Sequence, residues 1–210
     1  MEDTIMKRIF ALLLAFVIMA TMSACAFSGL GNQTAKLSRG TIEDDVYKNE
    51  FLGFEFTKPD SWVYSTDEEI ADVMNVAVDS LMGEKFKDAL EKNPAIYDMM
   101  VIDANTGTNI NVVYENLKKS YSSNITVDQY VEALKKQTTE LEGLSISFSD
   151  KLEKVTLGES EFTKCVCTTT AYGKKLTQVY YLRKVSGYMA SVVVTIASGY
   201  TAADIEAMFK

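Results

Sequence analysis

The sequence of 210 residues contains no histidine. Histidine is the usual general base of nucleophilic triads and the commonest metal ligand, so its absence excludes Ser-His and Cys-His mechanisms. The chain also lacks G-x-S-x-G, S-x-x-K, phosphate-loop and dinucleotide-binding motifs, which are common signatures of hydrolases and nucleotide-binding proteins. We therefore expect no catalytic residues of these kinds, no bound metal and no cofactor.

The chain also lacks an excess of positive charge. Its 21 basic and 29 acidic residues leave a formal net charge of −8. A nucleic-acid-binding protein needs a basic surface for the phosphate backbone, so nucleic acid is excluded as the expected partner. The remaining composition, 47% apolar and 24% charged, is typical of one globular domain.

The first 24 residues have the order of a secretory signal peptide. Lys7 and Arg8 precede an uncharged run over residues 9–22, and small residues follow it, as in the basic, apolar and cleavage regions of such a leader. Met6, directly before the two basic residues, is a more natural start than Met1. We expect residues 1–24 to be removed.

The segment Met22-Ser23-Ala24-Cys25 resembles the bacterial lipobox. The resemblance implies cleavage before Cys25 and a diacylglycerol on its thiol, which would make the membrane a partner. Acyl chains anchor stably because each buried methylene contributes about 0.8 kcal/mol. Two alternatives remain: cleavage at Ala24-Cys25-Ala26 would release a soluble protein, and an uncleaved helix over residues 9–27 would span the bilayer.

Residues 25–42 contain several glycines and small hydroxylated residues without periodicity, and they are interpreted as a flexible tether. Residues 43–210 form the predicted domain. Capping boxes predict helices starting after Thr66, Thr126 and Thr201, of which the first extends to Leu81 and the second to Leu141, and a fourth helix is expected over residues 84–92. Alternating or glycine-bounded apolar runs predict strands over residues 52–56, 96–104, 109–115, 144–148, 151–157, 161–170, 175–184 and 188–196. Closely spaced strands favour an antiparallel meander, which with these helices gives an α+β fold.

Residues 47–62, YKNEFLGFEFTKPDSW, resemble the opening hairpin of PsbP-like domains, named after an extrinsic photosystem subunit. The order of elements over residues 43–209 is also similar, although only residues 47–62 are specific. The resemblance implies an α/β/α sandwich around a mainly antiparallel sheet. The chain resembles in particular the uncharacterised lipoproteins of Gram-positive bacteria that carry this fold. The resemblance transfers no site residues, because fold does not fix function.

Three residues of the domain have side chains that could bind a ligand. Trp62 is expected in the core, where its indole N–H needs a partner, with a ligand-binding role as the alternative. Cys165 and Cys167, two apart on a strand, point to one face and are expected to be buried thiols. A strained disulfide, or a metal site completed by carboxylates, is the alternative for this pair.

Two further motifs have structural interpretations. The segment over residues 103–107, DANTG, faintly resembles a calcium loop, but position twelve is Tyr114 where a glutamate is required, so we expect a hairpin turn. Tyrosines on the predicted sheet are expected to pack in it, and an exposed aromatic binding surface is the alternative. The tyrosines concerned are Tyr114, Tyr172, Tyr180, Tyr181 and Tyr188.

The sequence therefore predicts a lipid-anchored protein on the extracytoplasmic face of the cell membrane. We expect a binding or accessory module for a protein or cell-envelope ligand, and not an enzyme. Two alternatives remain. One is an envelope hydrolase using a carboxylate pair, whose members need not be close in sequence. The other is a carrier of a small apolar ligand in a cavity between sheet and helices.

Overall fold

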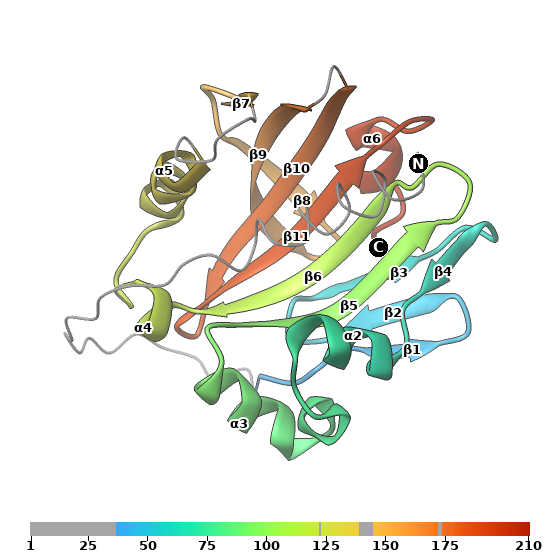
Figure 1. Ribbon diagram of the computed structural model, residues 1–210, viewed down its shortest axis with the longest axis vertical. Helices are drawn as coiled ribbons and strands as arrows, with labels where there is room; N and C mark the ends of the chain where they lie inside the picture. The colour runs from blue at the N-terminus through green and yellow to red at the C-terminus, as the bar shows by residue number, and fades with distance from the viewer. Residues whose placement is uncertain (1–36, 122, 139–144, 172–173) are drawn as a thin grey trace.

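The computed structural model describes residues 37–121, 123–138, 145–171 and 174–210. Its strands form a three-stranded sheet of order β1-β2-β3 and an eight-stranded sheet of order β4-β5-β6-β11-β10-β9-β7, with β8 also paired to β9 (Figure 1). Every pairing among the described strands is antiparallel. The predicted α+β class and antiparallel sheet are confirmed.

The strands are β1 Thr41–Glu43, β2 Val46–Asn49, β3 Phe54–Thr57, β4 Trp62–Tyr64, β5 Ala95–Asp103, β6 Asn109–Asn116, β7 Ser145–Phe148, β8 Glu153–Leu157, β9 Ser160–Ala171, β10 Lys174–Val185 and β11 Tyr188–Ile196. The helices are α2 Asp67–Met74, the 3-10 helix η1 Val78–Leu81, α3 Glu84–Lys92, α4 Leu117–Ser120, α5 Val127–Thr138 and α6 Ala202–Glu206.

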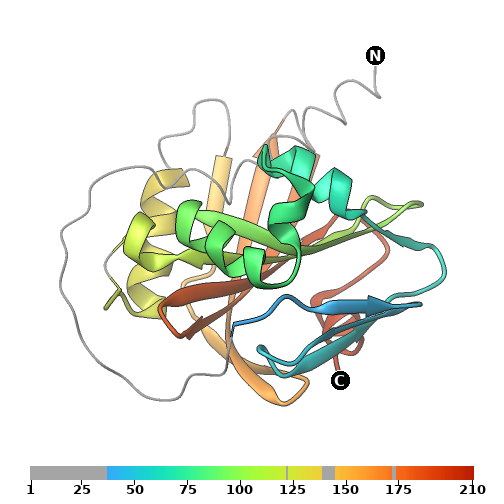
Figure 2. The same cartoon turned by 90° about the horizontal axis from the view of Figure 1, so that it is seen from below.

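The large sheet forms the middle layer of the molecule. Figure 2 shows α2, α3 and α5 on one side of it, and the small sheet with α6 on the other. The described residues form two hydrophobic cores, of which the larger also includes Ile70 of α2 and Leu90 of α3. The larger core includes Phe56 and Trp62, and the smaller one packs Tyr130 and Leu134 of α5 against Tyr180 of β10. The two sides of the large sheet therefore have different surroundings.

The helix starts follow the sequence closely. At α2, α5 and α6 the predicted capping threonine accepts a hydrogen bond from a backbone N–H three residues on, and that residue's side chain accepts one in return. The first helix is shorter than predicted. It ends at Met74, and the next residue, Asn75, is left-handed with φ 53° and ψ 46°. The next helix along the chain is η1. The predicted extension of α5 to Leu141 lies outside the described residues.

The small sheet is the main element that the sequence did not predict in full. Its strands have only three or four residues, and Gly53 lies in the preceding turn with φ +71°, before β3 starts. The C-terminus extends this sheet, because the backbone of Lys210 both donates to and accepts from Glu55 at 2.8 Å. The small sheet is thus closed at its β3 edge by the last residues of the chain.

Described residues before the predicted domain boundary at residue 43 also contact the fold. Leu37 packs against the larger core, Arg39 and Gly40 hydrogen-bond to β5, and β1 starts at Thr41. The predicted leader, residues 1–24, and the predicted lipidation site Cys25 lie outside the described residues. Within the described ranges, no helix has the length and apolar character needed to cross a bilayer.

Candidate functional site

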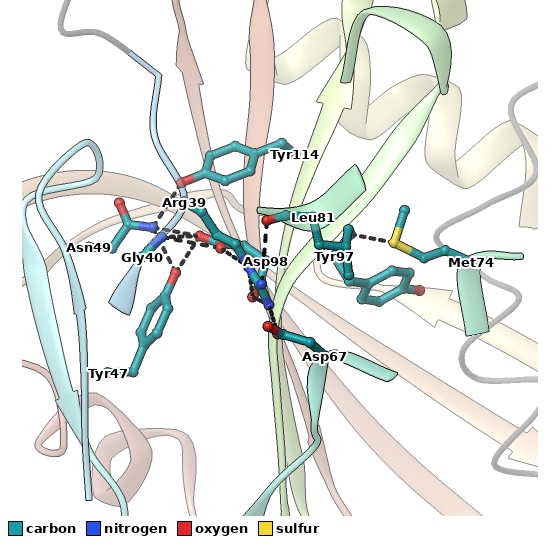
Figure 3. Close-up of polar contacts among 10 residues, drawn as sticks. All are labelled: Arg39, Gly40, Tyr47, Asn49, Asp67, Met74, Leu81, Tyr97, Asp98 and Tyr114. Atoms are coloured by element: carbon teal, nitrogen blue, oxygen red, sulfur yellow. Dashed lines mark hydrogen bonds and ion pairs between the residues drawn. The ribbon is translucent and has the colours of Figure 1, made fainter. Parts of the chain in front are cut away.

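A buried carboxylate lies at the junction between the N-terminal arm and the large sheet. The register of β5 against β6 shifts between Tyr97 and Met99, a bulge that turns the intervening Asp98 towards the small sheet. The Asp98 side chain is fully buried. Its carboxylate accepts hydrogen bonds from the Tyr47 hydroxyl at 2.6 Å and the Gly40 backbone N–H at 3.1 Å (Figure 3).

Arg39 ties this junction to the helical layer. Its Nε lies 3.3 Å from the Asp98 carboxylate, and Nε and Nη2 both donate to the Asp98 backbone carbonyl. Nη2 also lies 2.6 Å from Asp67 at the start of α2, and Nη1 donates to the Leu81 carbonyl at 3.5 Å. One guanidinium therefore connects the arm, β5, α2 and η1 (Figure 3).

The other side of the carboxylate is closed by side chains of the large and small sheets. The Asn49 amide N–H donates to Asp98 at 2.9 Å and to the Tyr114 hydroxyl at 2.8 Å. Gly40 is required by packing, because a Cβ there would lie 2.6 Å from Cζ of the Tyr47 ring. Burial raises the pKa of Asp98, opposed by the Tyr47 and Gly40 hydrogen bonds and by the charge of Arg39. These internal donors suit a structural junction better than a base that reacts with substrate.

A second buried carboxylate, Glu115, lies on the opposite face of the large sheet. It follows Tyr114 directly on β6, and neighbouring strand residues point to opposite faces. Glu115 is 4% exposed and accepts a hydrogen bond from the Tyr130 hydroxyl of α5. Burial raises its pKa, and the Tyr130 hydrogen bond acts in the other direction. Ser120 of α4 is also buried, and its side chain acts on the pKa of Glu115 in the same direction as Tyr130.

The buried carboxylates of Asp98 and Glu115 therefore do not converge. Asp98 faces the small sheet and Glu115 faces α5, each with its own tyrosine. Glycoside hydrolysis needs two carboxyl groups on either side of one bond. In the parts of the chain that the structure describes, no group of three or more histidine, cysteine or acidic side chains is arranged to hold a metal ion.

The helical side of the large sheet also carries a band of uncharged polar side chains, which we name the polar band. It consists of Asn109 and Asn111 on β6, Thr195 on β11, Gln178 on β10 and Thr169 on β9. Asn109 pairs with Thr195, and Thr195 with Gln178, so three of them form a row across neighbouring strands. Their exposed fractions lie between 1% and 7%.

The sequence-predicted candidates have structural roles where they are described. Trp62 is 1% exposed, and its indole N–H donates to the Tyr200 hydroxyl at 2.9 Å, as predicted for a core residue. Cys165 and Cys167 are buried free thiols beneath α5, and burial raises the pKa of Cys167 to about 11. The acidic turn at Asp103 is a hairpin loop held by a hydrogen bond from Thr106 at 2.7 Å.

The tyrosine surface is not formed. Tyr114 and Tyr181 are completely buried and Tyr180 is 3% exposed, while Tyr188 is partly buried. The alternative of an exposed aromatic patch on these residues is therefore wrong, and sheet packing is correct for them. Tyr172 lies outside the described residues.

Sequence reasoning missed Asp98, Glu115 and the polar band. A signal was present in each case, because Asp98 interrupts the apolar run of β5 and polar residues alternate with apolar ones along β6. Such residues at core positions need buried partners. The partners of Asp98 come from residues 39–49 and 114, a separation that periodicity does not reveal.

Comparisons with known proteins do not identify a family. No family model matches the chain, and no curated protein matches it. A crystal structure of a protein from Bacteroides thetaiotaomicron is similar over 75% of this chain and 44% of its own, with 12% sequence identity and a TM-score of 0.39. The chain thus spans less than half of that protein, and so distant a likeness carries no argument about function.

Proposed function

We propose that this protein is a lipid-anchored, non-catalytic binding or accessory module on the extracytoplasmic face of the cell membrane. The signal-peptide pattern and the lipobox-like segment ending at Cys25 support the anchor. The observation that carries the non-catalytic part is the separation of Asp98 and Glu115 on opposite sheet faces, each bound to protein donors. Kinship with PsbP-like lipoproteins remains part of this proposal.

The contacts that hold Arg39 against β5, α2 and η1 support a short connection between the membrane and the domain. Leu37 is the first described residue that packs against the larger core, so the tether would run from Cys25 to about residue 36. A flexible chain of that length has a root-mean-square span of about 20 Å. The module would therefore bind its ligand close to the bilayer surface.

The two alternative functions are less well supported. A hydrolase would need a second carboxylate facing Glu115 or Asp98, and Tyr130 or Tyr47 is found there. A carrier of an apolar ligand would need an apolar lining between sheet and helices. The apolar side chains between the large sheet and α5 instead pack against one another in the smaller core.

Metabolic labelling with palmitate in the native host tests the anchor. We expect the wild-type protein to incorporate label and to fractionate with membranes, and globomycin to cause its precursor to accumulate. The matched control is Cys25→Ser, which should lose the label and leave the domain unchanged. Wild-type protein that carries no label and is secreted into the medium would contradict the proposal.

A further inference from the structure

We propose that one end of the large sheet lies against the anionic lipid headgroups of the membrane. This end, which we name the basic end, consists of the lysines Lys92, Lys118, Lys119 and Lys184. The inference rests on the proposed function as a membrane-anchored module. It identifies which surface of the domain meets the bilayer and which headgroup charge that surface recognises.

Hydrogen bonds bring together the three elements that carry these lysines. The Asn116 side-chain amide, directly before α4, donates to the Leu90 carbonyl near the end of α3 at 3.0 Å. The Leu117 backbone N–H, at the start of α4, donates at 3.3 Å to the Gly187 carbonyl in the turn between β10 and β11. Figure 1 shows α3, α4 and this turn at the same end of the molecule.

The four lysines are exposed at this end and available to a partner. Lys92 is the last residue of α3, Lys118 and Lys119 lie within α4, and Lys184 is the last residue but one of β10. All four are exposed, and none has an ion-pair partner among the described residues. Other lysines do form ion pairs, such as Lys58, whose Nζ lies 2.6 Å from a carboxylate. The charges of the basic end are therefore not neutralised within the described fold.

The basic end is locally positive although the whole chain has a net charge of −8. Residues 116–121 and 184–188 contain three lysines and no acidic residue. Burial and then the charge of Glu91 raise the pKa of Tyr188, which places Glu91 beside the turn, and Glu115 is buried next to Asn116. An anionic surface attracts the basic end and repels the acidic remainder, so its field orients the domain.

The described chain enters the fold at the same end. Arg39 donates to the carbonyls of Leu81 and Asp98, and β5, which carries Asp98, begins at Ala95, three residues after Lys92. Figures 1 and 2 show the first described residues, in blue, at the end of the molecule where α3 and α4 lie. A tether that joins the chain there would hold the basic end towards the bilayer.

Lysine side chains suit a flat anionic surface, which requires no groove. Each carries a compact charge on a flexible four-carbon stem. A lysine close to an anionic membrane strengthens binding by about fivefold. This attraction extends only about one Debye length, roughly 10 Å at 0.1 M salt. The contact therefore depends on a tether that keeps the domain near the membrane, and it adds a second signal to the anchor.

Lysine footprinting on vesicles tests this assignment. Full-chain Cys25→Ser is reconstituted into vesicles of phosphatidylglycerol mixed with phosphatidylcholine, or of phosphatidylcholine alone. The vesicle-bound fraction is isolated by flotation, so the result does not depend on acylation. A membrane-impermeant reagent then acetylates exposed lysines. The measured ratio is the acetylation rate at the basic end divided by the rate at Lys151 and Lys175, two exposed lysines on other segments.

We expect this ratio to be lower by about fivefold or more on the vesicles that contain phosphatidylglycerol. The difference should disappear in about 1 M sodium chloride, where the Debye length is about 3 Å. Persistence of the protection at that salt concentration would contradict an electrostatic contact.

Two double variants locate the surface. Lys118→Gln with Lys119→Gln should restore acetylation of Lys92 and Lys184 on phosphatidylglycerol to the level seen on phosphatidylcholine. Lys151→Gln with Lys175→Gln removes the same charge from other segments and should retain the protection. Lysines near the ends of α3 and α4 also stabilise helix C-termini. That role would change thermal unfolding but not the dependence of acetylation on lipid charge.

The outcomes are distinct from those of the anchor experiment. Equal ratios on the two vesicle types, a restored ratio in the control variant, or no vesicle-bound chain would overturn the basic end as a lipid-binding surface. Equal protection by dissolved glycerol phosphate without vesicles would assign these lysines to a soluble anion and would also overturn it. Wild-type protein without palmitate, with protection retained in Cys25→Ser, would overturn the anchor alone.

Discussion

Replacement of Arg39 by methionine tests whether the arm is clamped to the domain. Methionine keeps an apolar stem of similar length but removes the guanidinium that lies 3.3 Å from the fully buried Asp98 carboxylate. Removing one partner of a buried pair destabilises a protein by about 3–5 kcal/mol. Because the Arg39 side chain is 16% exposed, we expect the lower end, about 3 kcal/mol. The contact to Asp67, whose side chain is 33% exposed, adds at most about 1 kcal/mol.

The Asp98→Asn background separates the charge interaction from the other contacts of Arg39. With the neutral amide at position 98, Arg39→Met removes mainly hydrogen bonds to the carbonyls of residues 98 and 81, and it should destabilise by about 1 kcal/mol. The double-mutant cycle should therefore give a coupling energy of about 2 kcal/mol. A coupling energy near zero would mean that the ion pair does not hold the arm.

Urea unfolding monitored by tryptophan fluorescence is a suitable assay, because the chain has one tryptophan and it is 1% exposed. In thermal unfolding, a loss of about 3 kcal/mol corresponds to a decrease in Tm of about 6–12 °C for a domain of this size. An Arg39→Met variant within about 0.5 kcal/mol of wild type, the range of an ordinary surface substitution, would refute the reasoning.

Three other predictions concern different parts of the fold. Gly158→Ala should lose roughly 3 kcal/mol of stability in urea unfolding, because its φ is positive and because the added methyl would lie 2.7 Å from Cβ of Phe54. Gly187→Ala, with φ +84° and open space around it, should lose about 1 kcal/mol. Equal losses for the two variants would contradict this reasoning. Burial raises the pKa of Glu115 above 4.5. The stability of wild type relative to Glu115→Gln should therefore be greatest below about pH 4.5 and fall as pH rises through the folded-state pKa. A stability difference between the two proteins that stays constant with pH would refute this prediction. Cys165 and Cys167 should react with a thiol reagent only after unfolding, and protection of either after unfolding under non-reducing conditions would indicate a disulfide.

Local signals predicted the helix starts and the long hairpins well. The reciprocal Thr66–Glu69 and Thr126–Gln129 hydrogen bonds follow from three-residue spacing alone. The end of α2 did not follow, because Asn75 adopts a left-handed conformation inside a run whose apolar spacing continues. The apolar periodicity of a sequence does not indicate that a single residue adopts a left-handed backbone conformation.

The small sheet and the candidate site depended on long-range contacts. A strand of three residues such as Thr41–Glu43 is too short to show alternation. The polar band requires the register that pairs Asn109 with Thr195 and Thr195 with Gln178, which the sequence does not specify. The sequence shows that these polar residues are present, but it does not show that they lie together on one face of the large sheet.

Mass spectrometry of the N-terminal peptide from membrane-purified protein is the most direct measurement of the central claim. We predict a peptide that begins at Cys25 and carries the mass of a diacylglycerol on its thiol. A mature N-terminus at Phe27 without lipid, or an intact leader before Cys25, would contradict the lipid-anchored account.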